Sequence, residues 1–310
     1  MKMNLLKTVS FLAIGTMIAG CSKQPETEKT SAQNHVELVA QGMSFSGPDT
    51  IPPGWTTFHL RNTSGMVHFA VFERMPEGYG LADQQSQIAP VFQTGMDLLN
   101  AGDPAAAMEA FGKLPPWFGQ IEFTGGPGFI SPAMTAVTTV YLQPGKYLLE
   151  CYVKTGGRFH SFNPAQIGMV HEFTVPDTLP ETTAPPTADI RVRISAESGF
   201  EIEGTLQSGP QTIAVEFLDQ KAHEHFLGHD IHLAQLTEDT DLLKVADWMN
   251  WTLPSGLETP APVRFLGGVH EMPAGQVGYF SVNVERGSFA FIAEVPDPLA
   301  KKMLQVVTVP

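Results

Sequence analysis

The chain has very few cysteines and few basic side chains for its length. Only two of its 310 residues are cysteine, and 18 lysines and arginines face 32 aspartates and glutamates, a formal net charge of −14. Two cysteines cannot build a disulfide framework, and we expect so acidic a chain to bind no nucleic acid. The motifs Gly-x-Ser-x-Gly and His-Glu-x-x-His are absent, which argues against the hydrolases that depend on them.

Long apolar runs are also missing, apart from one near the N-terminus. Two lysines precede an apolar run at residues 9–19, which is shorter than the roughly 20 residues that a spanning helix needs. This is the pattern of a signal peptide. The run ends in Ile-Ala-Gly-Cys, which resembles the lipobox of bacterial lipoprotein precursors. We therefore expect a signal peptide at 1–20 and a lipid on Cys21 that anchors the chain to a membrane; an ordinary secretory signal is the alternative.

Residues 21–34 are polar and without apolar periodicity, which predicts a flexible tether between lipid and folded part. Ser22 after the lipidated cysteine resembles the outer-membrane sorting signal of lipoproteins. In a cell with two membranes we therefore expect the protein on the periplasmic face of the outer membrane. Without residues 1–20 the net charge becomes −16, which favours a solvated exported protein.

The chain divides into two halves around a segment rich in proline. Residues 176–187 hold four prolines, typical of a stiff linker, and we place the linker at 177–188 between domains at 35–176 and 189–310. Each half has short, alternating runs rich in β-formers. They are 35–39, 55–61, 68–73, 136–142, 147–153 and 170–175, then 190–194, 211–217, 231–236, 278–284, 288–295 and 304–309. This pattern predicts an all-β fold of two tandem antiparallel Greek-key β-sandwiches, with helical insertions at 81–111 and 241–250.

The two halves look like copies of one another. A shift of 142 positions brings residues 125–153 onto 267–295, so that a Gly-Gly pair meets a Gly-Gly pair and Ala293 stands where Cys151 would be. Upstream, the segment that begins at His68 matches the one that begins at His232. We expect each copy to bury a core of its own.

Each half resembles a cupredoxin, the fold family of the type 1 copper proteins. In the first half the resemblance rests on His68 at the start of a strand, Pro-Gly-Lys-Tyr leading to Cys151, then His160, and a strand led by Met169. It implies copper bound by His68, Cys151, His160 and Met169. One-electron copper sites use a thiolate, two imidazoles and a weak thioether, and Cys151 has no partner for a disulfide once Cys21 carries lipid.

The spacing departs from the family's pattern. Eight residues separate Cys151 from His160, and eight more separate His160 from Met169, whereas the family has a tighter loop. His171 is a second candidate from this region. The structural alternatives are a Cys151 that packs as a small apolar side chain and a Met169 that belongs to the core.

The second half lacks the set, because Ala293 replaces the cysteine and no histidine lies between it and Met303. It carries a different cluster, which makes a weaker candidate metal site; its members are His223, His225, His229 and His232. His270 could approach the same end of the domain. The alternative is a solvated polar loop between two strands.

Three functions are compatible with this sequence. The first is copper binding for electron transfer or copper handling, with a redox or envelope protein as partner. The second is a metal-free binding or scaffold module with the same fold, and the third an envelope enzyme that uses the histidine cluster. A multicopper oxidase would need several His-x-His pairs, and the sequence has only the one at 223–225.

Overall fold

A computed structural model describes residues 34–179, 184–224 and 226–310, and these residues belong to one compact unit. The predicted signal peptide, Cys21, all of the tether but its last residue, and residues 180–183 of the linker lie outside the described residues. Within the described ranges, no helix has the length and apolar character needed to cross a bilayer.

β-strands are the main regular elements of the described chain, and the twelve predicted strands lie close to observed ones. The strands of the first half are β1 (Asn34–Gln41), β2 (Ser44–Ser46), β3 (Gly54–Asn62), β4 (Val71–Arg74), β5 (Glu122–Phe123), β6 (Thr135–Leu142), β7 (Gly145–Glu150), β8 (Lys154–Thr155), β9 (Arg158–Phe159) and β10 (Val170–Val175). Those of the second half are β11 (Ile190–Ser195), β12 (Gly199–Glu203), β13 (Gly209–Phe217), β14 (Ile231–Leu236), β15 (Arg264–Val269), β16 (Val277–Val284), β17 (Gly287–Ile292) and β18 (Leu304–Val309). The strands that were not predicted are β2, β5, β8, β9, β12 and β15.

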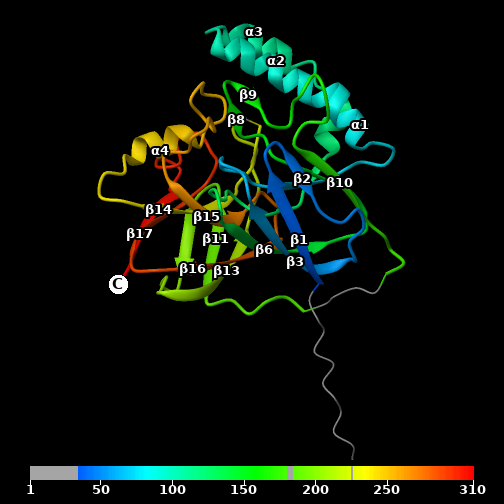
Figure 1. The fold of residues 1–310 in the computed structure, drawn as a ribbon. Helices are drawn as coiled ribbons and strands as arrows, with labels where there is room; N and C mark the ends of the chain where they lie inside the picture. The colour runs from blue at the N-terminus through cyan, green and yellow to red at the C-terminus, as the bar shows by residue number, and fades with distance from the viewer. Residues whose placement is uncertain (1–33, 180–183, 225) are drawn as a thin grey trace, which may run out of the picture. The chain divides into compact units, whose positions relative to one another are not determined.

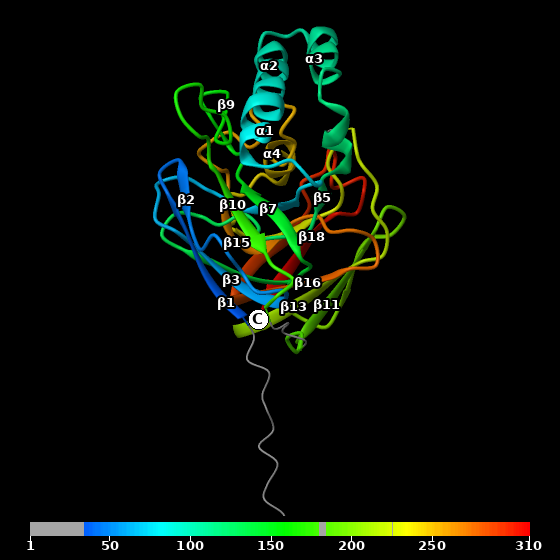
Figure 2. The same ribbon diagram turned by 90° about the vertical axis from the view of Figure 1, so that its right-hand side faces the viewer.

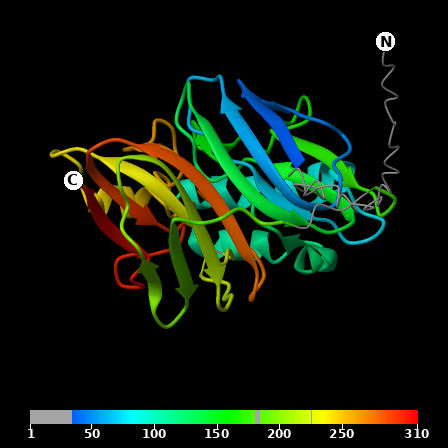
Figure 3. The ribbon, with the colours of Figure 1, turned by 90° about the horizontal axis from the view of Figure 1, so that it is seen from below.

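Three sheets form two sandwiches that share one layer. An eight-stranded sheet runs β12-β11-β13-β16-β6-β3-β1-β2 and serves both halves (Figure 3). The sheet β10-β7-β4-β5 belongs to the first half and β15-β14-β17-β18 to the second. In the first half the chain crosses between layers from β3 to β4, from β5 to β6 and from β6 to β7. The predicted all-β sandwich fold is therefore confirmed.

One pair of strands in each half departs from the antiparallel prediction. β1 pairs with β3 in parallel, and β11 pairs with β13 in parallel. In both halves the chain passes through a short edge strand, β2 or β12, and then a loop before it returns. This connection gives the chain enough length to re-enter the sheet in its original direction.

The repeat appears in the topology. β6 and β7 lie 142 residues before β16 and β17, which is the predicted shift. β6 pairs with β16 where the two halves meet. The amide of Cys151 donates to the carbonyl of Met169 at 3.1 Å, and the amide of Ala293 donates to that of Met303 at 2.9 Å. Ala293 therefore does occupy the position of Cys151.

The register of the strands corrects one of the expected equivalences. Val71 lies opposite Glu150 in the first half, whereas His232 lies opposite Ile292, the counterpart of Glu150. His232 therefore corresponds to Val71, and His229, three residues earlier, corresponds to His68. Sequence similarity paired the wrong histidines because only cross-strand hydrogen bonding fixes the register of so short a segment.

The repeated glycine pairs have a steric cause. At Gly126, where φ is +110°, a Cβ atom would lie 2.1 Å from the carbonyl oxygen of Ala70. At Gly268, the equivalent position, a Cβ atom would lie 2.2 Å from the carbonyl oxygen of Ile231. Only glycine allows the backbone to come this close to the neighbouring strand.

The helices are insertions on these sandwiches, as predicted. The first insertion, at the top of Figure 1, comprises α1 (Leu81–Asp83), the π-helix η1 (Gln84–Ile88), α2 (Ala89–Asn100), α3 (Pro104–Phe111) and the 3₁₀-helix η2 (Pro116–Gln120). The second is α4 (Leu242–Trp248), which begins where Asp241 accepts hydrogen bonds from two backbone amides. Figure 2 shows α1–α3 and α4 on the side of the sheets away from β11 and β13.

Most buried hydrophobic side chains of the two halves form one continuous core, so the expectation of two separate cores is wrong. A small separate cluster includes Met75, Ile88 and Trp117. The main cluster extends from Leu38 and Phe58 in the first half to Phe280 and Phe291 in the second. Because β6 pairs with β16, the eight-stranded sheet is continuous across this seam as well.

Candidate metal centre

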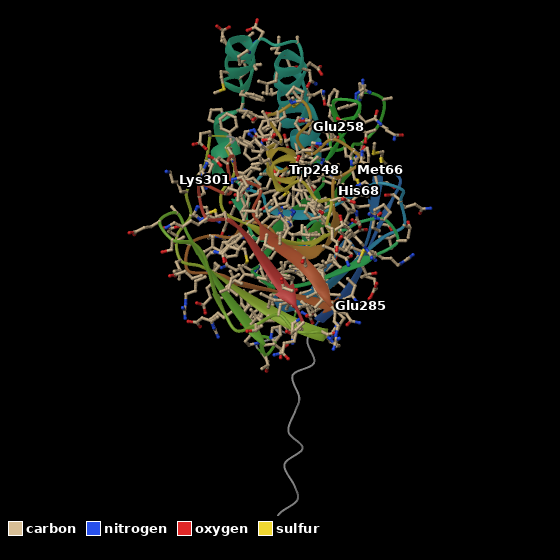
Figure 4. The ribbon with its side chains drawn as sticks, turned by 90° about the vertical axis from the view of Figure 1, so that its left-hand side faces the viewer. Met66, His68, Trp248, Glu258, Glu285 and Lys301 are labelled. Carbon is tan, nitrogen blue, oxygen red and sulfur yellow. The ribbon has the colours of Figure 1, made fainter. Side chains whose placement is uncertain are left out.

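His68 lies in the bend that leads into β4. Its backbone forms a bridge with Ile130, in which the amide of His68 donates at 3.2 Å and its carbonyl accepts at 2.7 Å. The side chain is fully buried. Figure 4 shows His68 beside Met66 and beneath Glu258, away from Glu285 at the far end of β16. The strand that was predicted to begin at His68 begins three residues later.

Cys151 follows directly after β7, and its thiol is fully buried. Its Sγ atom lies 3.5 Å from Nδ1 of His68, which is 83 residues away in the sequence. β4 and β7 are paired neighbours, and this pairing brings the bend before one strand to the end of the other.

His160 reaches the same place through a small hairpin. β8 and β9 pair with each other, and the amide of His160 donates to the carbonyl of Val153 at 2.8 Å. This turn returns the chain, so that Nδ1 of His160 lies 3.9 Å from Sγ of Cys151. The long spacing between Cys151 and His160 is thus accommodated by the hairpin.

The hairpin is fixed in place by the second half of the chain. Its turn consists of Gly156 and Gly157, both at positive φ, which glycine adopts without strain. Their amides donate to the carboxylate of Glu258, at 2.6 and 3.0 Å. Nothing in the local sequence predicts this contact, because Glu258 lies about a hundred residues further along the chain.

The three side chains have the spacing of ligands around one metal ion. The candidate ligand atoms of His68, Cys151 and His160 all lie within 4.8 Å of one another. With metal–sulfur and metal–nitrogen bonds of about 2.3 and 2.0 Å, ligands at the corners of a trigonal plane are about 3.7 Å apart. The observed distances of 3.5 and 3.9 Å agree with this value. A soft ion such as copper suits a thiolate with two imidazoles.

Met169 is held beside these three residues by its backbone. Its amide donates to the carbonyl of His160 at 2.7 Å, and its carbonyl accepts from the amide of Cys151 at 3.1 Å. Its side chain is fully buried. The segment between His160 and Met169 is therefore a closed loop with both ends at the cluster.

Two polar side chains orient the loop around His160. The Nε2 atom of His160 lies 3.0 Å from the hydroxyl of Thr155. When Nε2–H donates to this hydroxyl, Nδ1 carries no proton and its lone pair faces Cys151. Gln85, from η1, donates to the carbonyl of Ser161 at 3.0 Å and accepts from the amide of Gly168 at 2.8 Å. Sequence reasoning missed both residues, which carry no motif.

Burial dominates the electrostatics of the cluster. Burial lowers the pKa of His68 to about 4, although a backbone contact with Gly42 opposes the shift. It also lowers the pKa of His160 to about 3, and the neighbouring His68 lowers it further. Burial also raises the pKa of the Cys151 thiol to about 12, although backbone contacts with Phe69 and Val153 oppose it. Both imidazoles are therefore neutral and able to ligate at neutral pH, and a metal ion would displace the thiol proton.

The other candidate of this loop lies elsewhere. His171 sits on β10 with its Nε2 atom 3.4 Å from the carbonyl of Pro48 and 3.6 Å from the carboxylate of Asp49. Its ring is directed to the loop after β2.

Of the histidine cluster predicted in the second half, the structure describes His223, His229 and His232. His225 lies outside the described residues. The rings of His223 and His229 are 5.1 Å apart, and Nδ1 of His229 lies 3.4 Å from the carboxylate of Asp219. His232 instead joins Asp230 and His270 in a separate buried group. His270 thus approaches this end of the domain, as predicted, and Asp230 is the member that sequence reasoning missed.

The hydrogen bonds of His232 argue against a metal in that group. Its Nδ1 atom accepts from the amide of Phe129 at 3.2 Å, and its Nε2 atom lies 2.7 Å from the carboxylate of Asp230. Nε2 therefore carries the proton, and neither nitrogen of a neutral ring has a lone pair left for a metal ion. Asp230 also accepts from the amide of Glu294 at 2.6 Å, so this network ties β14 to the segment that follows β17.

No protein-family model and no curated protein sequence matches the chain. Among solved structures, auracyanin A, a "blue" copper protein from Chloroflexus aurantiacus, is similar at 16% identity and a TM-score of 0.28, over 46% of this chain and 99% of that one. The auracyanin of Roseiflexus castenholzii is similar at 15% identity and a TM-score of 0.28, over 39% and 94%. The copper nitrite reductase of Nitrosomonas europaea is similar at 12% identity and a TM-score of 0.23, over 90% and 94%. These are loose likenesses, and the case for a metal rests on distances within this chain.

Proposed function

We propose that this protein binds one copper ion through His68, Cys151, His160 and Met169 and uses it for one-electron transfer. The observation that supports this most directly is the placement of two imidazole Nδ1 atoms at 3.5 and 3.9 Å from one buried sulfur. Met169 is proposed as the weak thioether ligand, since its backbone is bonded to both Cys151 and His160.

Copper bound there supplies a couple that gains and loses a single electron. The residues of the chain keep the ligand atoms in place and keep water out, because all four proposed ligands are almost fully buried. Cys151, His160 and Met169 lie directly next to the ends of the paired strands β7, β9 and β10. A rigid, dry site changes little between two oxidation states, which favours electron transfer over storage.

An outer edge of the site meets a surface depression where a redox partner can approach. The depression has a volume of about 290 Å³, and His160, Thr155, Arg158 and Phe162 contribute to its wall. His160 lines this depression and also lies beside Cys151, so its ring offers a covalent path from the site to the surface. Electron transfer needs only such an edge, whereas delivery of the ion requires the ligands to open.

The test is reconstitution of the purified chain, begun at Ser22, with Cu(II). We expect one copper per chain by metal analysis and an intense visible absorption from charge transfer between thiolate and copper. Cys151→Ala should lose both, whereas His223→Ala should lose neither. If the unsubstituted chain holds no copper, the metal-free binding module is the better account.

Reduction separates electron transfer from copper handling. For an electron-transfer protein, ascorbate should bleach the absorption, ferricyanide should restore it, and the copper should remain bound through several cycles in the presence of a Cu(I) chelator. Loss of the ion to the chelator in the first cycle would instead support copper handling.

We also propose that the mature chain is anchored through lipid on Cys21, on the periplasmic face of the outer membrane where the cell has one. The support is the lipobox-like sequence before Cys21 and the polar segment after it. Cells that express the chain should incorporate labelled fatty acid into it, and Cys21→Ser should abolish this labelling. Recovery of the label in the variant would contradict the assignment.

A further inference from the structure

A second cavity lies beside the segment of chain that carries Cys151. It has a volume of about 310 Å³, and the residues before and after this cysteine, Glu150 and Tyr152, line it while Cys151 does not. Its remaining walls come from both halves of the protein, including Phe92 of α2 and Trp251 of the loop after α4. The cavity is thus a feature of the assembled fold and uses no proposed copper ligand.

The walls of this cavity are largely aromatic. The ring of Phe92 lies 5.6 Å from that of Phe118 and 5.8 Å from that of Trp251, and the ring of Phe159 lies 5.7 Å from Trp251. Aromatic faces attract cations through their quadrupoles and also accept hydrocarbon. Such a wall therefore suits a ligand that is both apolar and positively charged.

Two carboxyl groups converge on this aromatic space. Glu73 of β4 and Glu150 of β7 both line the cavity, and they are 7% and 8% exposed. The carboxylate of Glu150 accepts from the side-chain amide of Gln84. The carboxyl groups of Glu73 and Glu150 are themselves within hydrogen-bond contact of one another.

Burial, above all, and the nearby carboxyls of Glu150 and Glu271 raise the pKa of Glu73 well above its ordinary value, and no cationic side chain of the described residues opposes them. Two carboxyls that lie this close need either a shared proton or a cation between them. A cavity large enough for an organic molecule beside the pair favours the second arrangement.

We propose that this cavity binds a small organic ammonium ion, whose N–H groups donate to Glu73 and Glu150 and whose hydrocarbon part lies against the aromatic rings. A primary or secondary amine with an aromatic or branched aliphatic body matches these walls. A neutral alcohol of the same shape has no charge to offer the carboxylates, and a carboxylic acid would bring a third negative charge.

Isothermal titration of the purified chain with 2-phenylethylamine tests this assignment, with 2-phenylethanol and 3-phenylpropanoate as matched neutral and anionic probes. We expect binding of the amine alone. Glu73→Gln should weaken it on the order of tenfold or more, the loss expected for a charge-assisted hydrogen bond. Glu37→Gln, at an exposed carboxylate of β1, is the control and should leave the affinity unchanged.

A second variant guards against the effects of Glu73→Gln on folding. Ala89→Phe introduces a large side chain at a wall of the cavity and should abolish binding, while a urea titration confirms that the variant is folded. The proposal is overturned if the alcohol or the acid binds as tightly as the amine, if no amine binds, or if folded Glu73→Gln keeps full affinity. Amine binding should persist in Cys151→Ala, so its outcome is separate from that of the copper proposal.

Discussion

Sγ of Cys151 and Nδ1 of His68 lie 3.5 Å apart in the interior of the protein. The chain forms this pair by placing the residue after one strand beside the bend before its neighbour, and adds His160 through a hairpin. In the second half the position of Cys151 is taken by Ala293, so the same backbone arrangement lacks the sulfur. One sandwich thus carries a candidate metal centre, and its copy carries hydrogen-bonded histidines.

His160, rather than His171, should be the second imidazole ligand. His160→Ala should remove the visible absorption of the copper-loaded protein, because the only other histidine of this loop region is directed to Asp49. His171→Ala should keep the absorption at its original wavelength. The opposite pattern of spectra would show that β10 and the loop rearrange when the ion binds.

Gln85 should control how firmly the ion is held without touching it. Gln85→Ala removes two hydrogen bonds that close the loop between His160 and Met169. At about 1 kcal/mol for each bond, we expect a modest loss of stability and a faster transfer of copper to an external chelator. Ser86→Ala, an exposed neighbour in η1, serves as the control. Equal transfer rates in Gln85→Ala and the unsubstituted protein would contradict this role.

Lys154 should be important for stability because it joins the two halves. Its buried ammonium donates to the carbonyls of Trp251 and Leu253 at 2.9 and 2.8 Å. Lys154→Met removes the ammonium that donates to both carbonyls, at a cost on the order of 2–4 kcal/mol. The measurement is the urea midpoint, with Lys244→Met, at an exposed lysine of α4, as control. A midpoint as high as that of the control would show that water replaces the ammonium.

Glu271 should make the protein less stable as the pH rises. Burial raises its pKa to about 8, helped by Asp230 and opposed by the amide of Gly228. The unfolded chain loses this proton near the ordinary value of 4.5, so between these pH values the folded state binds more protons. The stability that protonated Glu271 contributes below about pH 4.5 is therefore lost as the pH rises toward about 8.

The variant Glu271→Gln tests this dependence, since it cannot ionise. Its free energy of unfolding should fall less than that of the unsubstituted protein between about pH 5 and about pH 8.5, by on the order of 3 kcal/mol. Urea titrations at the two pH values give the comparison, and Glu37→Gln is the control. Parallel losses in all three proteins would place the titrating group elsewhere.

The sequence by itself determined most of the strands, the insertions and the repeat. Alternating runs set the positions of twelve strands to within a few residues, and the matching glycine pairs marked the repeat. It also determined which residue types could ligate copper in the first half, since Cys151, His160 and Met169 lie in one stretch of chain. These features depend on local side-chain pattern and backbone sterics, which a sequence contains directly.

Only the tertiary structure decided the register, the geometry of the site and the second cavity. His229 rather than His232 corresponds to His68 because cross-strand hydrogen bonds fix the alignment of β14 with β17. Glu258 and Gln85 hold the loop of His160 from distant segments, and Glu73 meets Glu150 through the pairing of β4 with β7. Contacts of this kind follow from packing across the whole fold, and no local pattern in the chain encodes them.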